Sequence, residues 1–412
     1  PPPPPPPPPP QTPMFASVYD LRSLGYMTPV KDQGNCGSCW AHANLGVVEA
    51  RWKMLGTGTY DLSENNLANC KIFDGDACSG SCAHSYVAAY FANLTGPVNE
   101  SADPYVPVPG SCLSKPRIGT VLDWREIPYD MNTMKQTLID YGPFVISMNW
   151  DQAYYNTSNF TYYYNGSQPI NHAVIVAGWD DNKVTAGGTG AWIIKNSWGA
   201  ANGDGGYFYI SYNDTKLGIG VGTSFFPTLT NTNTNEVSYH YSNGHWGSYG
   251  YGQNVAQYGL VKYSAFANQQ IDRISTYVGG ANSTVSFEIY DNFDGAALSG
   301  LLFSSVDLTC EWPGLYTWNI PAINVGKWND FYIKVKYNSP GNTYPIPIEL
   351  ETAPKAPTIQ SNVCWIGLTG TNNWLAIGAN TSYKANLTIR AYTTPGPTTM
   401  LNCTSPVALN CG

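Results

Sequence analysis

The stretch that most constrains this chain surrounds residue 39 and reads Gln33-Gly34-Asn35-Cys36-Gly37-Ser38-Cys39-Trp40-Ala41. Directly after Cys39, apolar residues recur at helical spacing, at Ala41, Leu45, Val48 and Trp52. This spacing predicts a helix that begins at Cys39, where backbone N–H groups and the helix dipole favour a thiolate. Glycines between Gln33 and Cys39 let the chain fold back, so that the Gln33 amide can point to the same place. The stretch therefore predicts a cysteine nucleophile with an oxyanion donor beside it.

Two segments far along the chain could supply the base that such a nucleophile needs. His172 stands in Asn171-His172-Ala173-Val174-Ile175-Val176-Ala177-Gly178-Trp179, and Asn196 stands in Trp192-Ile193-Ile194-Lys195-Asn196-Ser197-Trp198-Gly199. Each adjoins a β-rich apolar run, so each side chain can be held rigidly at a strand end. Cys-x-x-Cys alone would also fit a redox pair or half of a zinc site, but no second closely spaced Cys or His pair is present. The set of residues therefore favours a cysteine nucleophile with a histidine base, and neither a metal nor a cofactor is expected.

Cys-Gly-Ser-Cys-Trp with distant His and Asn residues is a signature of papain and the cathepsins. Together with the Asn-Ser-Trp-Gly segment, it gives residues 15–225 a resemblance to papain-like cysteine peptidases. The resemblance implies that Cys39 attacks the scissile carbonyl as a thiolate and that His172 protonates the leaving amine. It also implies that Asn196 orients His172, and that Gln33 binds the oxyanion together with the Cys39 backbone N–H.

The same resemblance implies a substrate cleft between a helical lobe and a β-rich lobe. The family carries a glycine loop along the substrate where this chain has Cys78–Cys82, although Ser81 replaces one of the glycines. A small apolar pocket for the residue before the scissile bond is expected beside His172, and Trp198 is expected to shield the His–Asn bond from water. The expected substrate-binding residues are Gly80, Ser81, Ala83, Ile170, Asn171, Ala173 and Trp198. No insertion obviously blocks an end of the cleft, which favours an endopeptidase over an exopeptidase.

Ten cysteines and many sequons for N-glycosylation suggest an oxidising, extracellular setting. The resemblance implies the disulfides Cys36–Cys78 and Cys70–Cys112, which leaves Cys82 either as a free thiol or as a partner in rearranged bridges. Cys310 with Cys364, and Cys403 with Cys411, could form further bridges. The candidate glycosylation sites are Asn93, Asn99, Asn156, Asn159, Asn165, Asn213, Asn282, Asn380, Asn386 and Asn402.

Charge and hydropathy exclude several classes of function. The net charge is −8, and only 12% of the residues are charged, about half the usual quarter. An acidic chain without a basic run is a poor ligand for nucleic acid or for an anionic membrane surface. No apolar stretch is long enough to span a bilayer. A secreted or cell-surface protein is therefore expected.

The order of segments predicts an α+β fold, a two-lobed papain-like domain, followed by an all-β sandwich. Residues 1–13 form a polyproline spacer, 14–226 the peptidase domain, 227–236 a polar linker, 237–393 the β-domain and 394–412 a tail. In the β-domain, Val285, Phe287 and Ile289 alternate with polar residues, as do Phe331, Ile333 and Val335, and Leu387 with Ile389. Its sequence resembles the lectin-like domain that follows papain-like domains in some prokaryotic surface proteins. Tryptophans at 312, 318, 328, 365 and 374 could form a sugar platform, but packing in the core is favoured.

These features favour a secreted or cell-surface cysteine endopeptidase that acts on polypeptides through a thioester at Cys39. Two alternatives are a structural or adhesive surface protein that keeps a peptidase fold, and a transpeptidase that uses the same thioester chemistry. The β-domain could attach the protein to glycans or cells, or support self-assembly. Because its linker carries no motif that reaches the cleft, removal of everything after Phe226 is expected to leave hydrolysis nearly unchanged.

Overall fold

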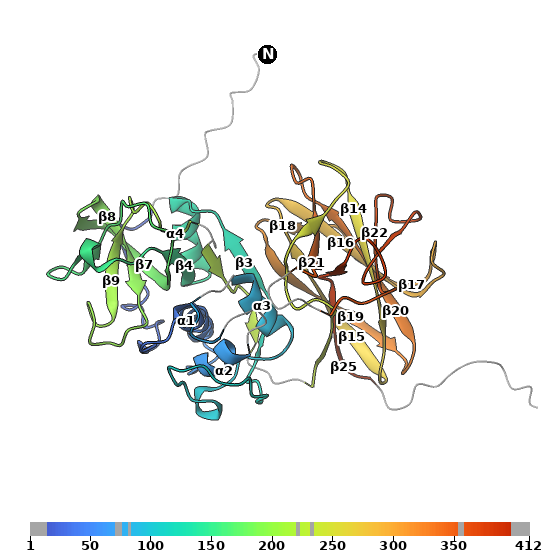
Figure 1. Ribbon diagram of the computed structural model, residues 1–412, viewed down its shortest axis with the longest axis horizontal. Helices are drawn as coiled ribbons and strands as arrows, with labels where there is room; N and C mark the ends of the chain where they lie inside the picture. The colour runs from blue at the N-terminus through green and yellow to red at the C-terminus, as the bar shows by residue number, and fades with distance from the viewer. Residues whose placement is uncertain are drawn as a thin grey trace, which may run out of the picture. The chain divides into compact units, whose positions relative to one another are not determined.

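The computed structural model describes residues 15–70, 76–80, 84–219, 223–230, 235–352 and 358–396 (Figure 1). They form two compact units. Unit 1 takes its residues from the chain up to Gly34, from 42–59 and from 127–225, and unit 2 takes them from 35–41, 60–126 and 226 onward. The expectations for the polyproline run, Ser81, Cys82, Ala83, Asn402, Cys403 and Cys411 fall outside the described residues.

Helix α1 (Cys39–Met54) begins at the residue predicted to open it. The predicted stripe of Ala41, Leu45, Val48 and Trp52 is at most 1% exposed, and the residues between them are buried as well, apart from the half-buried Arg51. A helix that is buried on all sides is a core helix rather than a surface one. The sequence therefore placed the helix correctly but underestimated how much of it is enclosed.

In unit 1, α1 is fixed to the sheet by a close approach and by a buried charge. A Cβ atom on Gly46 would lie 2.7 Å from Ile175 Cδ1, so a larger residue here would have to displace the end of that side chain from between helix and strand. Glu49 is 1% exposed and accepts hydrogen bonds from Thr28 Oγ1 at 2.7 Å and Lys31 Nζ at 3.0 Å. The Lys195 ammonium, at the end of a neighbouring strand, donates to Thr28 Oγ1 at 3.1 Å. Because buried charges need such partners, this network fixes the helix relative to the strand that precedes Asn196.

The strands of unit 1 form a sheet in the order β10-β4-β7-β8-β9-β6-β5, and β1 also pairs with β7; the labelled strands β4, β7, β8 and β9 are green in Figure 1. Strands β4 and β7 are almost wholly buried over their apolar runs, which explains why these runs read as continuous rather than alternating. The elements of unit 1 besides α1 are β1 (Val18–Asp20), α4 (Met131–Asp140), β4 (Phe144–Met148), the 3₁₀ helix η2 (Gln152–Tyr154), β5 (Tyr155–Asn156), β6 (Thr161–Tyr162), β7 (His172–Thr185), β8 (Gly188–Lys195), β9 (Tyr207–Ser211) and β10 (Thr223–Phe225).

Unit 2 contains the short helices α2 (Glu64–Asn69) and α3 (His84–Ala92) and the 3₁₀ helix η1 (Glu100–Ala102). Ser63 caps α2, since its hydroxyl oxygen accepts from the Asn66 N–H at 2.9 Å. A serine in this position satisfies one of the N–H groups that a helix start leaves without an intrahelical partner.

The β-rich part of unit 2 is a sandwich. One sheet has the order β12-β25-β15-β19-β3, a second has β17-β16-β20-β14-β22-β23 with β18 beside β16, and β13-β21-β24 and β11-β2 form smaller sheets. These strands are β2 (Thr120–Val121), β3 (Trp124–Ile127), β11 (Leu229–Thr230), β12 (Val237–Tyr239), β13 (Ser248–Tyr249), β14 (Gln257–Ser264), β15 (Gln269–Val278), β16 (Ser283–Phe293), β17 (Leu298–Ser304), β18 (Leu308–Cys310), β19 (Gly314–Val325), β20 (Asp330–Asn338), β21 (Ile346–Leu350), β22 (Cys364–Gly367), β23 (Leu375–Ile377), β24 (Ala385–Leu387) and β25 (Arg390–Pro395). The alternating apolar residues of β16 and β20 face one common core, as the sequence predicts.

The sandwich and residues 60–126 share unit 2 and are joined by specific contacts. The Tyr277 hydroxyl donates to the Ser85 carbonyl at 2.9 Å, and the Tyr392 hydroxyl donates to the Ala92 carbonyl at 3.0 Å. Strand β3 pairs with β19, with Trp124 opposite Leu315. In the segment expected to be a linker, β11 pairs with β2. The sandwich is therefore part of the same compact body as α2 and α3.

Buried positions in the sandwich correct several expectations. Cys310 and Cys364 are not bonded to each other, because β18 and β22 are separated by β16, β20 and β14. Four steps of about 4.8 Å place these strands about 19 Å apart, whereas a disulfide needs Cα atoms within about 7 Å. Asn386 is fully buried, and its Nδ2 donates to the Tyr241 and Thr358 carbonyls, so it cannot carry a glycan in the folded protein.

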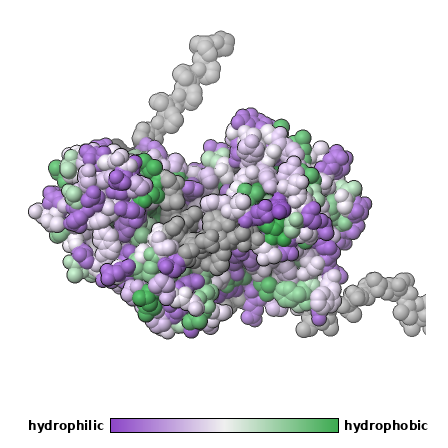
Figure 2. Space-filling model, in the orientation of Figure 1, coloured by the Kyte–Doolittle hydropathy of each residue, from purple (hydrophilic) through white to green (hydrophobic). Residues whose placement is uncertain are grey.

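The tryptophans of the sandwich lie in different environments, and not all of them pack in the main core. Trp318 packs against the main core, and Trp365 and Trp374 pack on a smaller apolar cluster elsewhere in the sandwich. Trp328 is 74% exposed. Hydrophilic and intermediate residues cover most of the face drawn in Figure 2, with apolar spots scattered among them. No helix in the described part of the chain is long and apolar enough to cross a membrane.

Candidate active site

His172 opens β7, where it lies opposite Met148 of β4. Its side chain is buried, and its Nε2 atom lies 2.9 Å from Asn196 Oδ1. The Ser197 backbone N–H donates to the same Asn196 atom at 2.9 Å, which identifies that atom as the amide oxygen. Since an amide oxygen only accepts, His172 Nε2 carries the hydrogen atom and donates a hydrogen bond to Asn196 Oδ1. In the neutral ring, Nδ1 is therefore the basic nitrogen.

Trp198 covers the imidazole ring. The rings of Trp198 and His172 are stacked with centroids 4.7 Å apart and planes inclined by 19°. Burial lowers the pKa of His172 to about 4, and the hydrogen bond with Asn196 acts in the opposite direction. An isolated imidazolium is thus unfavourable here near neutral pH, and a nearby negative charge is needed to stabilise it.

Gln33 is held by the residue that follows Asn196. The Ser197 hydroxyl donates to Gln33 Oε1 at 2.6 Å, and the Gln33 backbone N–H donates to the Ser197 carbonyl at 2.8 Å. Because the carboxamide oxygen accepts from Ser197, the NH₂ end of the amide is directed away from Ser197, as an oxyanion donor requires. The sequence motif identifies Gln33 but gives no signal for Ser197, because no local pattern links its hydroxyl to a residue 164 positions away.

Cys39 is 5% exposed and is the first residue of α1. Cys36 and Cys78 form one disulfide, and Cys70 and Cys112 form another, the two pairings implied by the family resemblance. Cys39 belongs to neither. A Cβ atom on Gly37 would lie 2.5 Å from the Cys78 carbonyl oxygen, so glycine is required where the nucleophile loop runs beside Ser79. The bridge and this glycine fix the turn that leads into the helix.

The remaining substrate-binding expectations have different outcomes. Gly80 is described, and it neighbours the Gly37 loop. Ile170 is partly exposed, and Ala173 is largely buried in the pairing of β4 with β7. The Asn171 side chain is bonded to the backbone of Trp150: its Oδ1 accepts from the Trp150 N–H at 2.7 Å and its Nδ2 donates to the Trp150 carbonyl at 3.0 Å. Asn171 therefore holds Trp150 in place beside the histidine.

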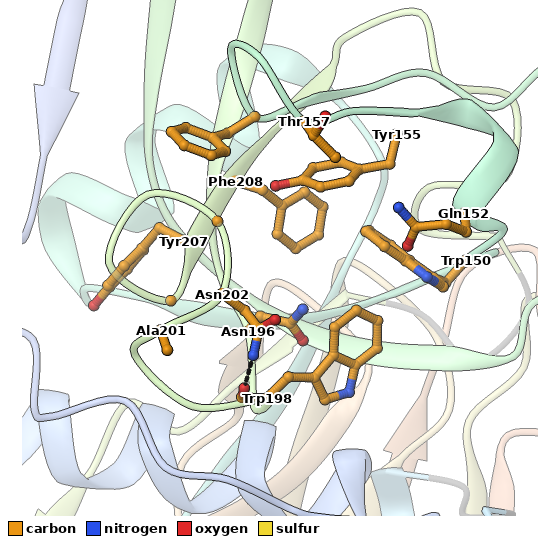
Figure 3. Close-up of a pocket in the computed structure, with 13 residues that line it drawn as sticks. Trp150, Gln152, Tyr155, Thr157, Asn196, Trp198, Ala201, Asn202, Tyr207 and Phe208 are labelled. Carbon is orange, nitrogen blue, oxygen red and sulfur yellow. Dashed lines mark hydrogen bonds between the residues drawn. The ribbon is translucent and has the colours of Figure 1, made fainter.

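Trp150 lines a pocket of about 470 Å³ in unit 1, which no pattern in the sequence predicts (Figure 3). Six of its thirteen lining residues are aromatic and come from several strands and loops, so no single local motif predicts the pocket. The lining residues are Trp150, Gln152, Tyr155, Thr157, Phe160, Asn196, Trp198, Ala201, Asn202, Gly203, Gly206, Tyr207 and Phe208. Among the residues that the structure describes, no group of His, Cys, Asp and Glu side chains gathers to hold a metal ion.

Comparison with known proteins places this geometry in a family. The model of the papain family cysteine proteases matches residues 15–225, and the model of a lectin-like domain matches residues 238–393. Cathepsin K of Gallus gallus is 35% identical over 201 residues, and cathepsin K of Mus musculus is 33% identical over 201 residues. These matches cover 47% of this chain, which spans 58% and 59% of the two relatives.

Two solved structures share the fold over nearly the whole chain. One is a point variant of the clostridial cysteine protease Cwp84 after propeptide cleavage, with a TM-score of 0.82 and 21% identity over 92% of this chain and 100% of that one. The other contains the cysteine protease and lectin-like domains of Cwp84, a surface layer associated protein of Clostridium difficile, with a TM-score of 0.80 and 21% identity over 93% of this chain and 90% of that one. They confirm the α+β fold followed by a β-rich domain. The chain thus belongs to the papain family of cysteine proteases and carries a lectin-like domain after its protease domain.

Proposed function

We propose that this protein is a cysteine endopeptidase that is secreted or displayed at the cell surface. The observation that carries the proposal is the buried His172–Asn196 hydrogen bond under the Trp198 ring, because it leaves one basic ring nitrogen for a thiol. Cys39, at the start of a buried helix, is the nucleophile in this proposal. Membership of the papain family supports the same assignment.

In the proposed reaction the Cys39 thiol proton moves to His172 Nδ1, and the thiolate sulfur attacks the scissile carbonyl carbon. The negative charge on the carbonyl oxygen is bound by the Gln33 NH₂ group and the Cys39 backbone N–H. The C–N bond then breaks as His172 donates its proton to the leaving amine, which leaves a thioester on Cys39. Water deprotonated by His172 hydrolyses the thioester and restores the thiol.

The acidity of His172 fits this scheme, because the thiolate is the charge that its protonated form needs. Burial disfavours imidazolium, and an opposite charge within about 4–6 Å favours it. The active form is then a thiolate–imidazolium pair. Activity should rise with pH as the thiol ionises and fall when His172 loses its proton.

An Asn196→Ala variant is expected to move the alkaline limb of kcat/KM to lower pH. The hydrogen bond to Asn196 raises the pKa of His172, so its loss lowers that pKa and removes the imidazolium earlier as pH rises. A shift of about one pH unit corresponds to about 1.4 kcal/mol. The measurement is the full pH profile of peptide hydrolysis, with Asn182→Ala, an exposed asparagine of the same unit, as control. A lower rate with an unmoved alkaline limb would contradict the role of Asn196.

Alkylation of the native protein tests the assignment of the nucleophile. Iodoacetamide near neutral pH should modify Cys39 and spare Cys310 and Cys364, because burial raises the pKa of each of these two thiols to about 12. Loss of hydrolysis should follow the modification of Cys39 with the same rate. Peptide mapping by mass spectrometry gives the sites, and Cys82 is quantified separately. Inactivation that proceeds without label on Cys39 would overturn the proposal.

We propose residues 14–226 as the peptidase domain and 237–393 as the lectin-like domain, in agreement with the ranges of the two family models. Attachment to a cell surface is supported by the shared fold with a surface layer associated protease. Glycosylation is proposed for exposed sequons such as Asn156, Asn159 and Asn165. Mass spectrometry before and after glycosidase treatment tests it.

A further inference from the structure

The aromatic pocket of unit 1 is built around Trp150. The Trp150 ring stacks on Tyr162 with centroids 5.0 Å apart, and it meets the rings of Trp198 and Phe208 edge to face at 4.8 and 5.3 Å. Tyr155 lies 5.2 Å away on a further side. Figure 3 shows the open space bordered by Trp150, Tyr155, Phe208 and Trp198. The rings fix one another, so the hollow is preformed.

Local backbone conformation also maintains the pocket. Phe160 has a φ of +61°, a conformation that is unfavourable for a bulky residue, and its carbonyl accepts from the Tyr209 N–H at 2.9 Å. Strain of this kind concentrates at functional sites. On another side, the Asn202 side-chain amide donates to the Trp198 carbonyl (dashed in Figure 3), which holds the turn that carries Ala201. The walls therefore do not depend on a bound ligand for their position.

The pocket shares a wall with the proposed catalytic histidine. Trp198 lies between them, with one contact to the His172 ring at 4.7 Å and another to the Trp150 ring at 4.8 Å. In the proposed reaction His172 gives its proton to the leaving amine, so the part of the substrate that begins with this amine lies on the histidine side. A side chain that enters the pocket therefore belongs to the leaving segment.

We propose, on the basis of the function proposed above, that this pocket binds an aromatic side chain of one of the first two residues after the scissile bond. Its lining has six aromatic rings and no charged residue, and its polar groups outside those rings are amides and a threonine hydroxyl. Its volume of about 470 Å³ lies within the range of about 300–1,000 Å³ typical of ligand sites. A tyrosine or phenylalanine ring can pack against the edges and faces of these rings. An alanine side chain is too small to fill the space between them, and a lysine ammonium would lose its hydration.

The selectivity can be measured apart from the acylation step. A short peptidyl methyl ester forms the thioester on Cys39 and releases methanol. An added amino-acid amide then competes with water: its nitrogen attacks the thioester carbonyl, the C–S bond breaks, the sulfur leaves as thiolate, and the amine proton passes to His172. The ratio of peptide amide to free acid reports how well the added amine binds on the leaving-group side.

The probes are phenylalaninamide and glycyl-phenylalaninamide, each compared with its alanine and lysine counterparts. The aromatic amine is expected to give at least about ten-fold more aminolysis than its alanine counterpart in one of the two series. Ala201→Trp and Thr157→Trp fill the pocket from two sides and should each abolish this preference. Ala153→Trp, the same change as the first at an exposed residue outside the pocket, should retain it.

The outcomes distinguish a failure of the pocket inference from a failure of the proposed function. An unchanged aromatic preference in both filled variants, or no preference in the wild type in either series, would overturn the pocket inference while ester hydrolysis still supports the peptidase. Absence of any hydrolysis of the ester by the wild type would instead contradict the proposed function itself.

Discussion

Cys39→Ala is expected to lower peptide hydrolysis by roughly a thousand-fold or more while the protein stays folded. The variant loses the only atom that forms the thioester, and neither Gln33 nor His172 can replace it as a nucleophile. The side chain is small and Cys39 is in neither disulfide, so its removal leaves both bridges in place. The measurement is kcat/KM on an internally quenched peptide together with the midpoint of thermal unfolding.

Cys364→Ala provides the matched control, since Cys364 is also a buried thiol outside the disulfides. This variant should lose stability through a small cavity but keep the wild-type rate for each folded molecule. The two variants therefore separate loss of a nucleophile from loss of packing. Substantial hydrolysis by Cys39→Ala would mean that another residue carries the reaction.

Removal of everything after Phe226 is expected to destabilise the protease part severely. The sequence alone predicts little effect of this cut on hydrolysis, but unit 2 joins residues 60–126 to the sandwich. The fragment would expose Trp124, whose ring meets Tyr277, and Tyr86, whose ring meets Trp246. Each buried aromatic side chain returned to water costs about 1.5–3 kcal/mol, and a whole domain has a stability of only about 5–15 kcal/mol.

The measurement compares the fragment that ends at Phe226 with the full chain by urea unfolding and by peptide hydrolysis. The fragment should unfold at a much lower urea concentration, and its activity should fall with its folded fraction. Co-expression of the chain from residue 227 onward, as a separate polypeptide, should recover both properties if the lost contacts are the cause. A fragment that keeps the full unfolding midpoint would show that the sandwich does not support α3.

A buried arginine also links the sandwich to the end of α3. Arg390 is fully buried, and its guanidinium donates to the Ser242 carbonyl at 3.1 Å and to Asn93 Oδ1 at 3.4 Å. In the sequence, Leu387 and Ile389 alternate with polar residues, so that the polar residues lie on the opposite face of the chain. The structure buries that face as well, because the segment that contains Ser242 and the end of α3 cover it. Local alternation reports which residues are apolar, whereas only the packed fold decides what covers the opposite face.

The residues of the proposed catalytic site could be identified from the sequence because each belongs to a local pattern. A helix start after Cys39 and apolar strand runs beside His172 and Asn196 follow from spacing alone. Ser63 as the cap of α2 is local in the same way. Short-range backbone preferences determine such features, so they can be predicted without knowledge of distant contacts.

Other properties arise where distant segments meet, and only the tertiary structure decided them. Strand order keeps Cys310 apart from Cys364, and burial removes Asn386 from the candidate glycosylation sites. The pocket beside Trp198 combines rings from residues 150 to 208 whose spacing follows no helical or strand period. The sequence by itself thus determined the family, the proposed nucleophile and its partners. Long-range packing determined the thiol environments, the aromatic pocket and the contacts that join residues 60–126 to the sandwich, because these depend on which surfaces meet.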